Sequence, residues 1–152
     1  MPMRKNYWRA VKSLYGEQIE LGGIKGGSVK KDALREDTEV CEQIRVATWL
    51  AKKRIVFYHI PNGGYRRFEE AVKLKNMGVA AGVPDICIPI ARKGYHGLYI
   101  ELKRESGGKL SEAQRYWGEV LMAEGYAWHE AKGARECIGI ICHYLGIANV
   151  NI

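Results

Sequence analysis

Three charged residues in the middle of the chain have types and a spacing that suit metal-assisted chemistry. Asp85 follows a Gly-Val-Pro turn at 82–84, and Glu101 lies sixteen residues further on, two residues before Lys103. Because strand side chains alternate between the two faces of a sheet, Glu101 and Lys103 are expected to point the same way, opposite to their apolar neighbours. A short loop at the start of the neighbouring strand could bring the Asp85 carboxylate beside that of Glu101.

Two carboxylates this close repel each other unless a cation lies between them. Oxygen ligands without a histidine or cysteine cluster are typical of Mg²⁺ or Mn²⁺ sites. Lys103, on the same face, could orient or help deprotonate a water at the metal, or offset charge that builds on a phosphate. The alternative is a charged strand face exposed to solvent, since Glu-x-Lys is a common chance pattern. The spacing therefore indicates a metal site and leaves the reaction open.

Hydrophobic periodicity and turn signals predict the elements that position these residues. Helices are predicted over 37–52, 66–77, 111–125 and 134–145, and strands over 54–60, 85–90, 97–103 and 126–129. Ser111 and Gln114 form a capping-box pattern at the start of the third helix. The order helix, strand, helix, strand, strand, helix, strand, helix predicts a small α/β domain with a mixed central sheet flanked by helices.

Length and composition suit one globular domain: the chain has 152 residues, of which 47% are apolar and 27% charged. No apolar stretch approaches the roughly 18–20 residues of a membrane span, and the amino terminus has no signal-peptide core, so we expect a cytoplasmic protein without a membrane partner. The four cysteines include no Cys-x-x-Cys pair, which favours buried reduced thiols over disulfides or zinc ligands.

The charge balance points to a polyanionic partner. Lysine and arginine outnumber aspartate and glutamate by 24 to 17, a net charge of +7, and nucleic acid is the usual partner of such a domain. Residues 1–36 hold eight of the basic and four of the acidic residues, and they are broken by glycine pairs. We interpret them as a basic arm that precedes a domain at 37–152. The arm either grips phosphates or is a solvated tail, and the sequence leaves both interpretations open.

The motifs taken together resemble a known family. Pro84-Asp85 followed by Glu101-Leu102-Lys103 is the signature of the PD-(D/E)xK nucleases. The wider pattern resembles the VRR-NUC (virus-type replication–repair nuclease) branch, especially its stand-alone phage and bacterial members. Further matching motifs lie at 39–43 (Glu-x-x-x-Gln), 59–64 (His-Ile-Pro-Asn-Gly-Gly), 75–78 (Lys-Asn-Met-Gly) and 109–114 (Lys-Leu-Ser-Glu-Ala-Gln). The resemblance covers about 37–145, in the expected order.

This resemblance implies a restriction-endonuclease-like fold and hydrolysis of phosphodiester bonds that depends on Mg²⁺ or Mn²⁺, without an organic cofactor. It assigns Asp85 and Glu101 as metal ligands and Lys103 as the catalytic lysine. A first-helix acid, the third metal ligand, maps best onto Glu39, with Glu42 as the fallback because both lie on core-facing stripes of the helix. A first-turn acid that only complements the helix dipole is the plainer interpretation of Glu39.

The resemblance also bears on residues outside the metal cluster. Gln114 has two interpretations of nearly equal weight, as a capping-box residue or as a catalytic residue near the active site. His59 is more typical of a half-buried strand histidine than of a base. Residues implied to contact nucleic acid, mostly through the phosphate backbone, are Asn62, Arg66, Arg67, Lys75, Lys109 and Arg115.

Small dimers that act on branched DNA are the expectation for stand-alone members of this branch. The resemblance therefore implies a homodimer that cleaves Holliday junctions or flaps during DNA repair, in a bacterial or phage-infected cell. Two alternatives stay open. A sequence-specific restriction-type endonuclease would share the core but usually carries extra recognition elements. A non-catalytic basic module that binds nucleic acid would explain the charge without explaining the spacing of Asp85, Glu101 and Lys103.

Overall fold

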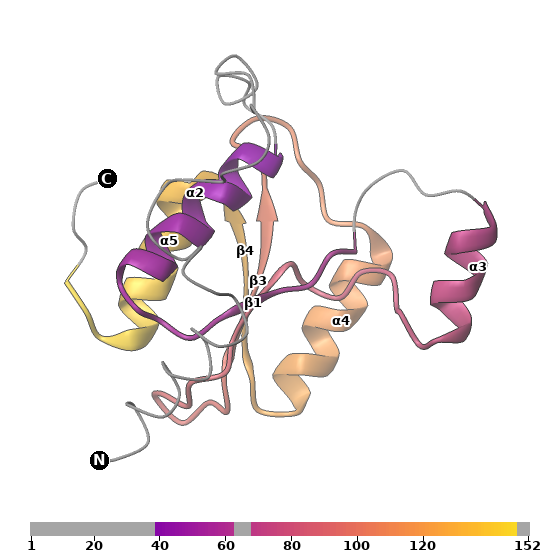
Figure 1. Ribbon diagram of the computed structural model, residues 1–152. Helices are drawn as coiled ribbons and strands as arrows, with labels where there is room; N and C mark the ends of the chain where they lie inside the picture. The colour runs from indigo at the N-terminus through magenta and orange to yellow at the C-terminus, as the bar shows by residue number, and fades with distance from the viewer. Residues whose placement is uncertain (1–38, 63–67, 149–152) are drawn as a thin grey trace, which may run out of the picture.

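A computed structural model describes residues 39–62 and 68–148 of the chain. Four strands form one mixed sheet, and three helices pack against it while a fourth stands apart (Figure 1). The elements, in chain order, are α2 (Glu39–Lys52), β1 (Tyr58–His59), α3 (Phe68–Asn76), β2 (Ile86–Ile88), β3 (Leu98–Lys103), α4 (Glu112–Ala123), β4 (Ala127–Lys132) and α5 (Gly133–Leu145). The predicted order of helices and strands and the α/β fold class are confirmed.

The strands lie in the order β1-β2-β3-β4, so neighbours in the chain are neighbours in the sheet. β1 and β2 pair antiparallel, as do β2 and β3, whereas β3 and β4 run parallel and are joined through α4. β3 is thus an inner strand with a partner on each side, which is why its residues are largely buried. Glu101 and Lys103 therefore lie on an inner strand of the sheet.

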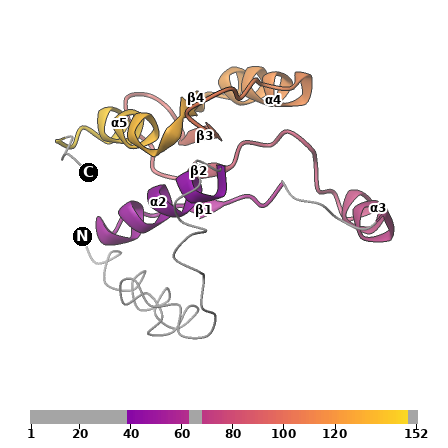
Figure 2. The same ribbon diagram turned by 90° about the horizontal axis from the view of Figure 1, so that it is seen from above.

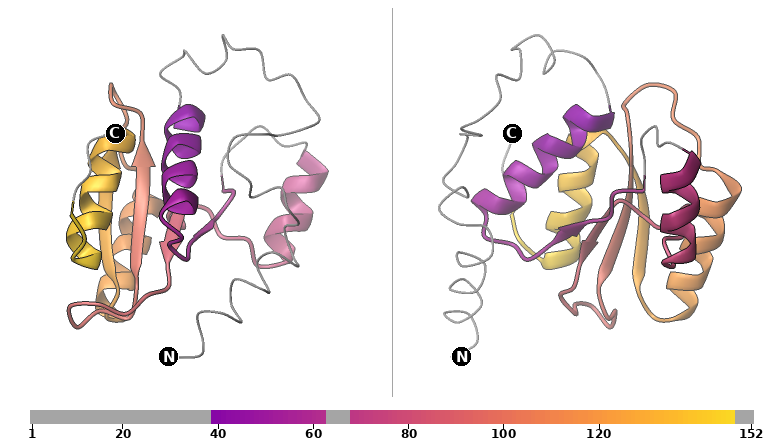
Figure 3. Two further views of the ribbon diagram at one scale, coloured as in Figure 1. Left: turned by 60° about the vertical axis from the view of Figure 1, so that its left-hand side comes forward. Right: turned by 45° about the vertical axis from the view of Figure 1, so that its right-hand side comes forward.

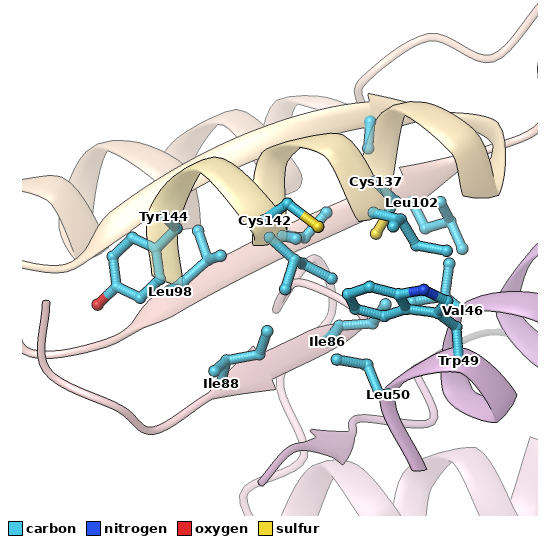
Figure 4. Close-up of a cluster of buried hydrophobic side chains, with 14 of the residues drawn as sticks. Val46, Trp49, Leu50, Ile86, Ile88, Leu98, Leu102, Cys137, Cys142 and Tyr144 are labelled. Atoms are coloured by element: carbon cyan, nitrogen blue, oxygen red, sulfur yellow. The ribbon is translucent and has the colours of Figure 1, made fainter. Parts of the chain in front are cut away.

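The core lies between one face of the sheet and the helices α2 and α5 (Figures 2 and 4). The apolar side chains of β3 that alternate with Tyr99 and Glu101 point into it and are fully buried. They meet Val46 and Leu50 of α2 and Ile138 and Ile141 of α5, which recur at helical spacing. The four cysteines are buried thiols, as their apolar surroundings predict.

The helix α4 covers the opposite face of the sheet. Trp128 of β4 lies against this helix at Gly118, where a Cβ would come within 2.8 Å of the indole ring. Trp128 pairs in register with Tyr99 of β3, so α4 lies on the same face as Tyr99 and Glu101. The charged residues of β3 therefore lie under a helix and not on an open strand face.

The element bounds differ from the predictions where the partner strand sets the length. β1 pairs over two residues instead of the seven predicted at 54–60, because its partner β2 is itself only three residues long and Arg54 turns away from α2 with a φ of 55°. β4 continues to Lys132, beyond the predicted 126–129, because it pairs with β3 residue by residue up to Lys103. Tertiary pairing overrode local propensity at both strands.

The helix α3 has no buried residue and lies away from the sheet in Figures 1 and 2 and in the left panel of Figure 3. Its large apolar side chains Phe68 and Val72 are exposed, as is Met77 just beyond its end. Within 39–62 and 68–148, no helix has the length and apolar character to cross a bilayer.

Glu42 ties α2 to α5 and is 1% exposed. Its carboxylate accepts a hydrogen bond from the backbone N–H of Ala134 and one from the Arg45 guanidinium. Lys132, the residue that precedes α5, makes no side-chain capping hydrogen bond. The Glu42 carboxylate of α2 therefore caps the amino terminus of α5 in its place.

We predict that Glu42→Ala lowers the free energy of unfolding by about 1–3 kcal/mol, because the Ala134 N–H loses its acceptor in a buried position. Glu39→Ala, three residues earlier on the same helix but exposed, serves as the matched control and should change the stability by less than about 0.5 kcal/mol. Urea unfolding followed by circular dichroism measures both. Equal losses in the two variants would contradict the capping role of Glu42.

Candidate active site

Asp85 lies just before β2, where the ladder with β3 has ended. The β2–β3 register, continued by one residue, places Asp85 opposite Glu101. Oδ2 of Asp85 accepts the backbone N–H of Leu102 at 2.9 Å, so the carboxylate side chain extends the pairing that the backbone no longer makes. This bond holds one oxygen of Asp85 at β3.

Glu101 and Lys103 lie on the α4 face of β3, as the alternation predicted, but they are buried and not solvated. Glu101 is 1% exposed and Lys103 is 7% exposed. Lys103 Nζ donates to Glu101 Oε1 at 2.7 Å. The other oxygen, Glu101 Oε2, is one of three buried side-chain polar atoms without a hydrogen-bond partner among the described residues. A buried carboxylate oxygen left unpaired calls for an explanation.

Glu39 completes a cluster of three acids. It stands in the first turn of α2 and is exposed, and each of Glu39, Asp85 and Glu101 offers a carboxylate oxygen such that these atoms lie within 4.8 Å of one another. Three carboxylates at this separation fit the donor set of Mg²⁺ or Mn²⁺, which prefer oxygen ligands. Glu101, which carries the unpaired oxygen, is a member of this cluster.

The pKa values of the site residues reflect several acids that lie close together in a partly buried site. Burial raises the pKa of Glu101 to about 7; the hydrogen bond from Lys103 opposes this rise, and the charges of Asp85 and Glu39 add to it. Burial likewise raises the pKa of Asp85, against the Leu102 N–H bond. Burial alone would lower the pKa of Lys103, but its bond to Glu101 and the surrounding carboxylates raise it. The lysine is therefore held in its charged form.

Gln114 combines the two interpretations that the sequence offered. Its Oε1 accepts the Ser111 N–H at 2.8 Å while the Ser111 hydroxyl accepts the Gln114 N–H at 3.2 Å, so the predicted capping box is present. Its Nε2 donates to Glu101 Oε1, the oxygen that also binds Lys103. One side chain thus starts α4 and contacts the acidic cluster.

The remaining sequence-predicted residues lie in different situations. Glu42, the fallback for the first-helix acid, lies outside the three-acid cluster and caps α5. Asn62 is half-buried, and its Nδ2 donates to the Val83 carbonyl at 2.7 Å. Among the basic residues predicted to contact nucleic acid, Lys75, Lys109 and Arg115 are exposed. Arg66 and Arg67 lie outside the described residues.

Sequence reasoning missed the contact of His59 with this site. The histidine is exposed and not half-buried, and its Nδ1 lies 2.9 Å from the Asp85 carbonyl oxygen. The signal was its place at the end of the β1 run, directly before the Pro-Asn-Gly-Gly turn at 61–64. The partner, Asp85, lies 26 residues away in the chain and could not be read from that spacing.

Comparison with known proteins shows the family of the chain. The family model of the VRR-NUC domain matches residues 31–135. A solved structure named "VRR_NUC domain protein" is 34% identical to this chain, with a TM-score of 0.61, and the likeness covers 75% of this chain and 93% of that one. No curated protein matches the chain. Since the matched region holds every element around the acidic cluster, from α2 to β4, the chain belongs to the VRR-NUC family of nucleases.

Proposed function

We propose that this nuclease is a metal-dependent endonuclease that hydrolyses phosphodiester bonds in branched DNA. The observation that carries the proposal is the cluster of Glu39, Asp85 and Glu101, with a lysine bound to its most buried member. A non-catalytic binding module gains nothing from burying acids, because buried charges cost stability unless they are compensated.

Each residue of the cluster has a distinct part in the proposed reaction. Glu39, Asp85 and Glu101 would hold Mg²⁺ or Mn²⁺, and a bound ion of this kind supplies Lewis-acid activation of water and of the phosphate. Lys103, fixed by its 2.7 Å bond to Glu101, places a positive charge where negative charge builds on the phosphate. Gln114 acts with it by fixing the same Glu101 oxygen from α4.

The charge distribution supports DNA as the substrate. Lys75, Lys109 and Arg115 are exposed and free to reach phosphates, and we propose that Arg66 and Arg67 join them. Contacts of this kind position DNA without reading its sequence. They favour a structure-selective enzyme, such as one that cleaves four-way junctions or flaps, over a sequence-specific restriction-type enzyme.

We predict that Asp85→Asn lowers cleavage by several orders of magnitude while DNA affinity stays equal or rises slightly, because a ligand charge is lost and the phosphate-binding surface is not. Asparagine keeps an acceptor for the Leu102 N–H, so folding should be preserved. Lys103→Met should lower cleavage similarly and keep metal binding. The assay compares a four-way junction, a flap, a nick, a plain duplex and a single strand, with MgCl₂ and with EDTA.

The first helix offers a matched control for this assay. Glu39→Gln should lose cleavage, whereas Glu42→Gln, which keeps an acceptor for the Ala134 N–H, should retain it. If the parent cleaves no DNA in the panel with Mg²⁺ or Mn²⁺, or if Asp85→Asn cleaves normally, the non-catalytic binding module becomes the better account.

We further propose that the protein acts as a two-fold dimer that offers two active sites to a symmetric junction. The exposed apolar side chains along α3 and after it, such as Phe68 (83% exposed) and Met77 (69%), provide surface for such an interface. Light scattering at tens of micromolar protein should give about twice the mass of one chain. A monomer at this concentration would contradict the dimer.

We predict that the metal-free protein loses stability as the pH rises. Between the ordinary Glu pKa of 4.5 and about 7, folded Glu101 keeps a proton that the unfolded chain has lost, so unfolding becomes easier by up to about 3 kcal/mol. Glu101→Gln should show a shallower pH dependence. MgCl₂ at pH 8 should raise the melting temperature of the parent and leave that of Glu101→Gln nearly unchanged. Parallel pH profiles for the two proteins would argue against a raised Glu101 pKa.

A further inference from the structure

The carbonyl oxygen of Asp85 is bound twice from β1 and its continuation. The Ile60 N–H donates to it at 2.8 Å, and His59 Nδ1 lies 2.9 Å from it. A carbonyl oxygen only accepts hydrogen bonds, so Nδ1 of His59 carries the hydrogen. The backbone of Asp85 is thereby fixed from one side, while its carboxylate is fixed at Leu102 from the other.

The residues that lead to Asp85 are also held by side chains. They precede β2, which begins at Ile86. The Val83 carbonyl accepts from Asn62 Nδ2 at 2.7 Å, and the Ala81 carbonyl accepts from Trp117 Nε1 at 3.1 Å. Three side chains thus bind the alternate carbonyls of residues 81, 83 and 85.

The same segment is pressed against α4. Gly82 has a φ of +84°, and a Cβ there would lie 2.6 Å from the backbone carbon of Ala113. The turn is therefore closed on the α4 side by packing and on the β1 side by hydrogen bonds. In a solvent-exposed loop, water can donate hydrogen bonds to the carbonyls, so the loop itself does not need a side-chain donor at each of three alternate carbonyls. What the arrangement accomplishes is a fixed direction for the Asp85 carboxylate.

We propose that His59 and Asn62 are positioning residues that hold Asp85 in the geometry needed to share a metal ion with Glu39 and Glu101. This inference rests on the metal site proposed above. It gives Asn62 a part different from DNA contact, since its amide N–H is already directed at Val83. Removing a polar group that orients a metal ligand commonly weakens metal binding by roughly 10- to 100-fold.

The test measures Mn²⁺ binding to the full chain without DNA, by the electron paramagnetic resonance signal of free Mn²⁺. Asn62→Ala and Asn62→Asp should both bind Mn²⁺ roughly 10-fold or more weakly than the parent. The aspartate variant is the sharper one: its added negative charge would by itself tighten Mn²⁺ binding, whereas loss of the Val83 bond weakens it. Asn76→Asp, the same change at an exposed position of α3, is the control and should bind as the parent does.

His59 is tested by a pair of variants. His59→Leu removes the donor and should weaken Mn²⁺ binding by a similar factor. His59→Asn places an amide N–H where Nδ1 was and should restore Mn²⁺ binding to within about threefold of the parent. If His59→Leu weakened binding only through lost side-chain volume or lost stability, His59→Asn would not restore it. If His59→Asn binds as weakly as His59→Leu, positioning by His59 is wrong.

The outcomes separate this inference from the proposed function. If the parent binds no Mn²⁺, or if Asp85→Asn binds it as tightly as the parent, the metal site fails and the positioning role with it. If the parent binds Mn²⁺ and Asp85→Asn does not, yet Asn62→Asp binds at least as tightly as the parent, only the positioning role of Asn62 is overturned. Unchanged Mn²⁺ binding together with weaker DNA binding in EDTA would instead make Asn62 a DNA contact.

Discussion

The Glu101 carboxylate is almost out of contact with water on an inner strand, and the charge balance around it governs the arrangement of the site. One oxygen accepts hydrogen bonds from both Lys103 and Gln114, and the other has no hydrogen-bond partner within 39–62 and 68–148. Burying an acid costs free energy unless a positive charge and hydrogen bonds compensate for it. Burial raises the pKa of Glu101, and the charges of Asp85 and Glu39 add to this rise, which the single lysine does not offset. A divalent cation would supply the positive charge that the cluster lacks.

The helix α2 shows how one element serves both stability and the site. Glu39 and Glu42 are three residues apart, about 60° around the helix, and they meet different surroundings. Glu42 is fixed at the start of α5, which sets how α2 lies against the core. Glu39 follows from that placement, because the same helix then carries it to within 4.8 Å of the two strand carboxylates. A change that loosens the cap would therefore be felt at the cluster as well.

Other side chains around the site also hold the backbone in place and contact or orient an acid of the cluster. Gln114 closes the capping box of α4 and binds Glu101, and Asn62 and His59 bind the backbone that leads to Asp85. Networks in which every polar group is satisfied make a structure rigid and specific. Asp85 and one oxygen of Glu101 are held by hydrogen bonds from α4, from β1 and from β3 itself. Glu39 comes from α2, which the Glu42 hydrogen bond holds at the start of α5.

The sequence by itself determined the order of the elements, the shared face of Glu101 and Lys103 and the capping box at Ser111, because each depends on neighbours within a few residues. The family followed from the same local motifs, and comparison confirmed it. Only the tertiary structure decided whether the charged face of β3 meets water, since α4 covers it from further along the chain. It also decided which acid of α2 joins the cluster, because helical periodicity puts both on core-facing stripes and the packing of α2 on α5 separates them.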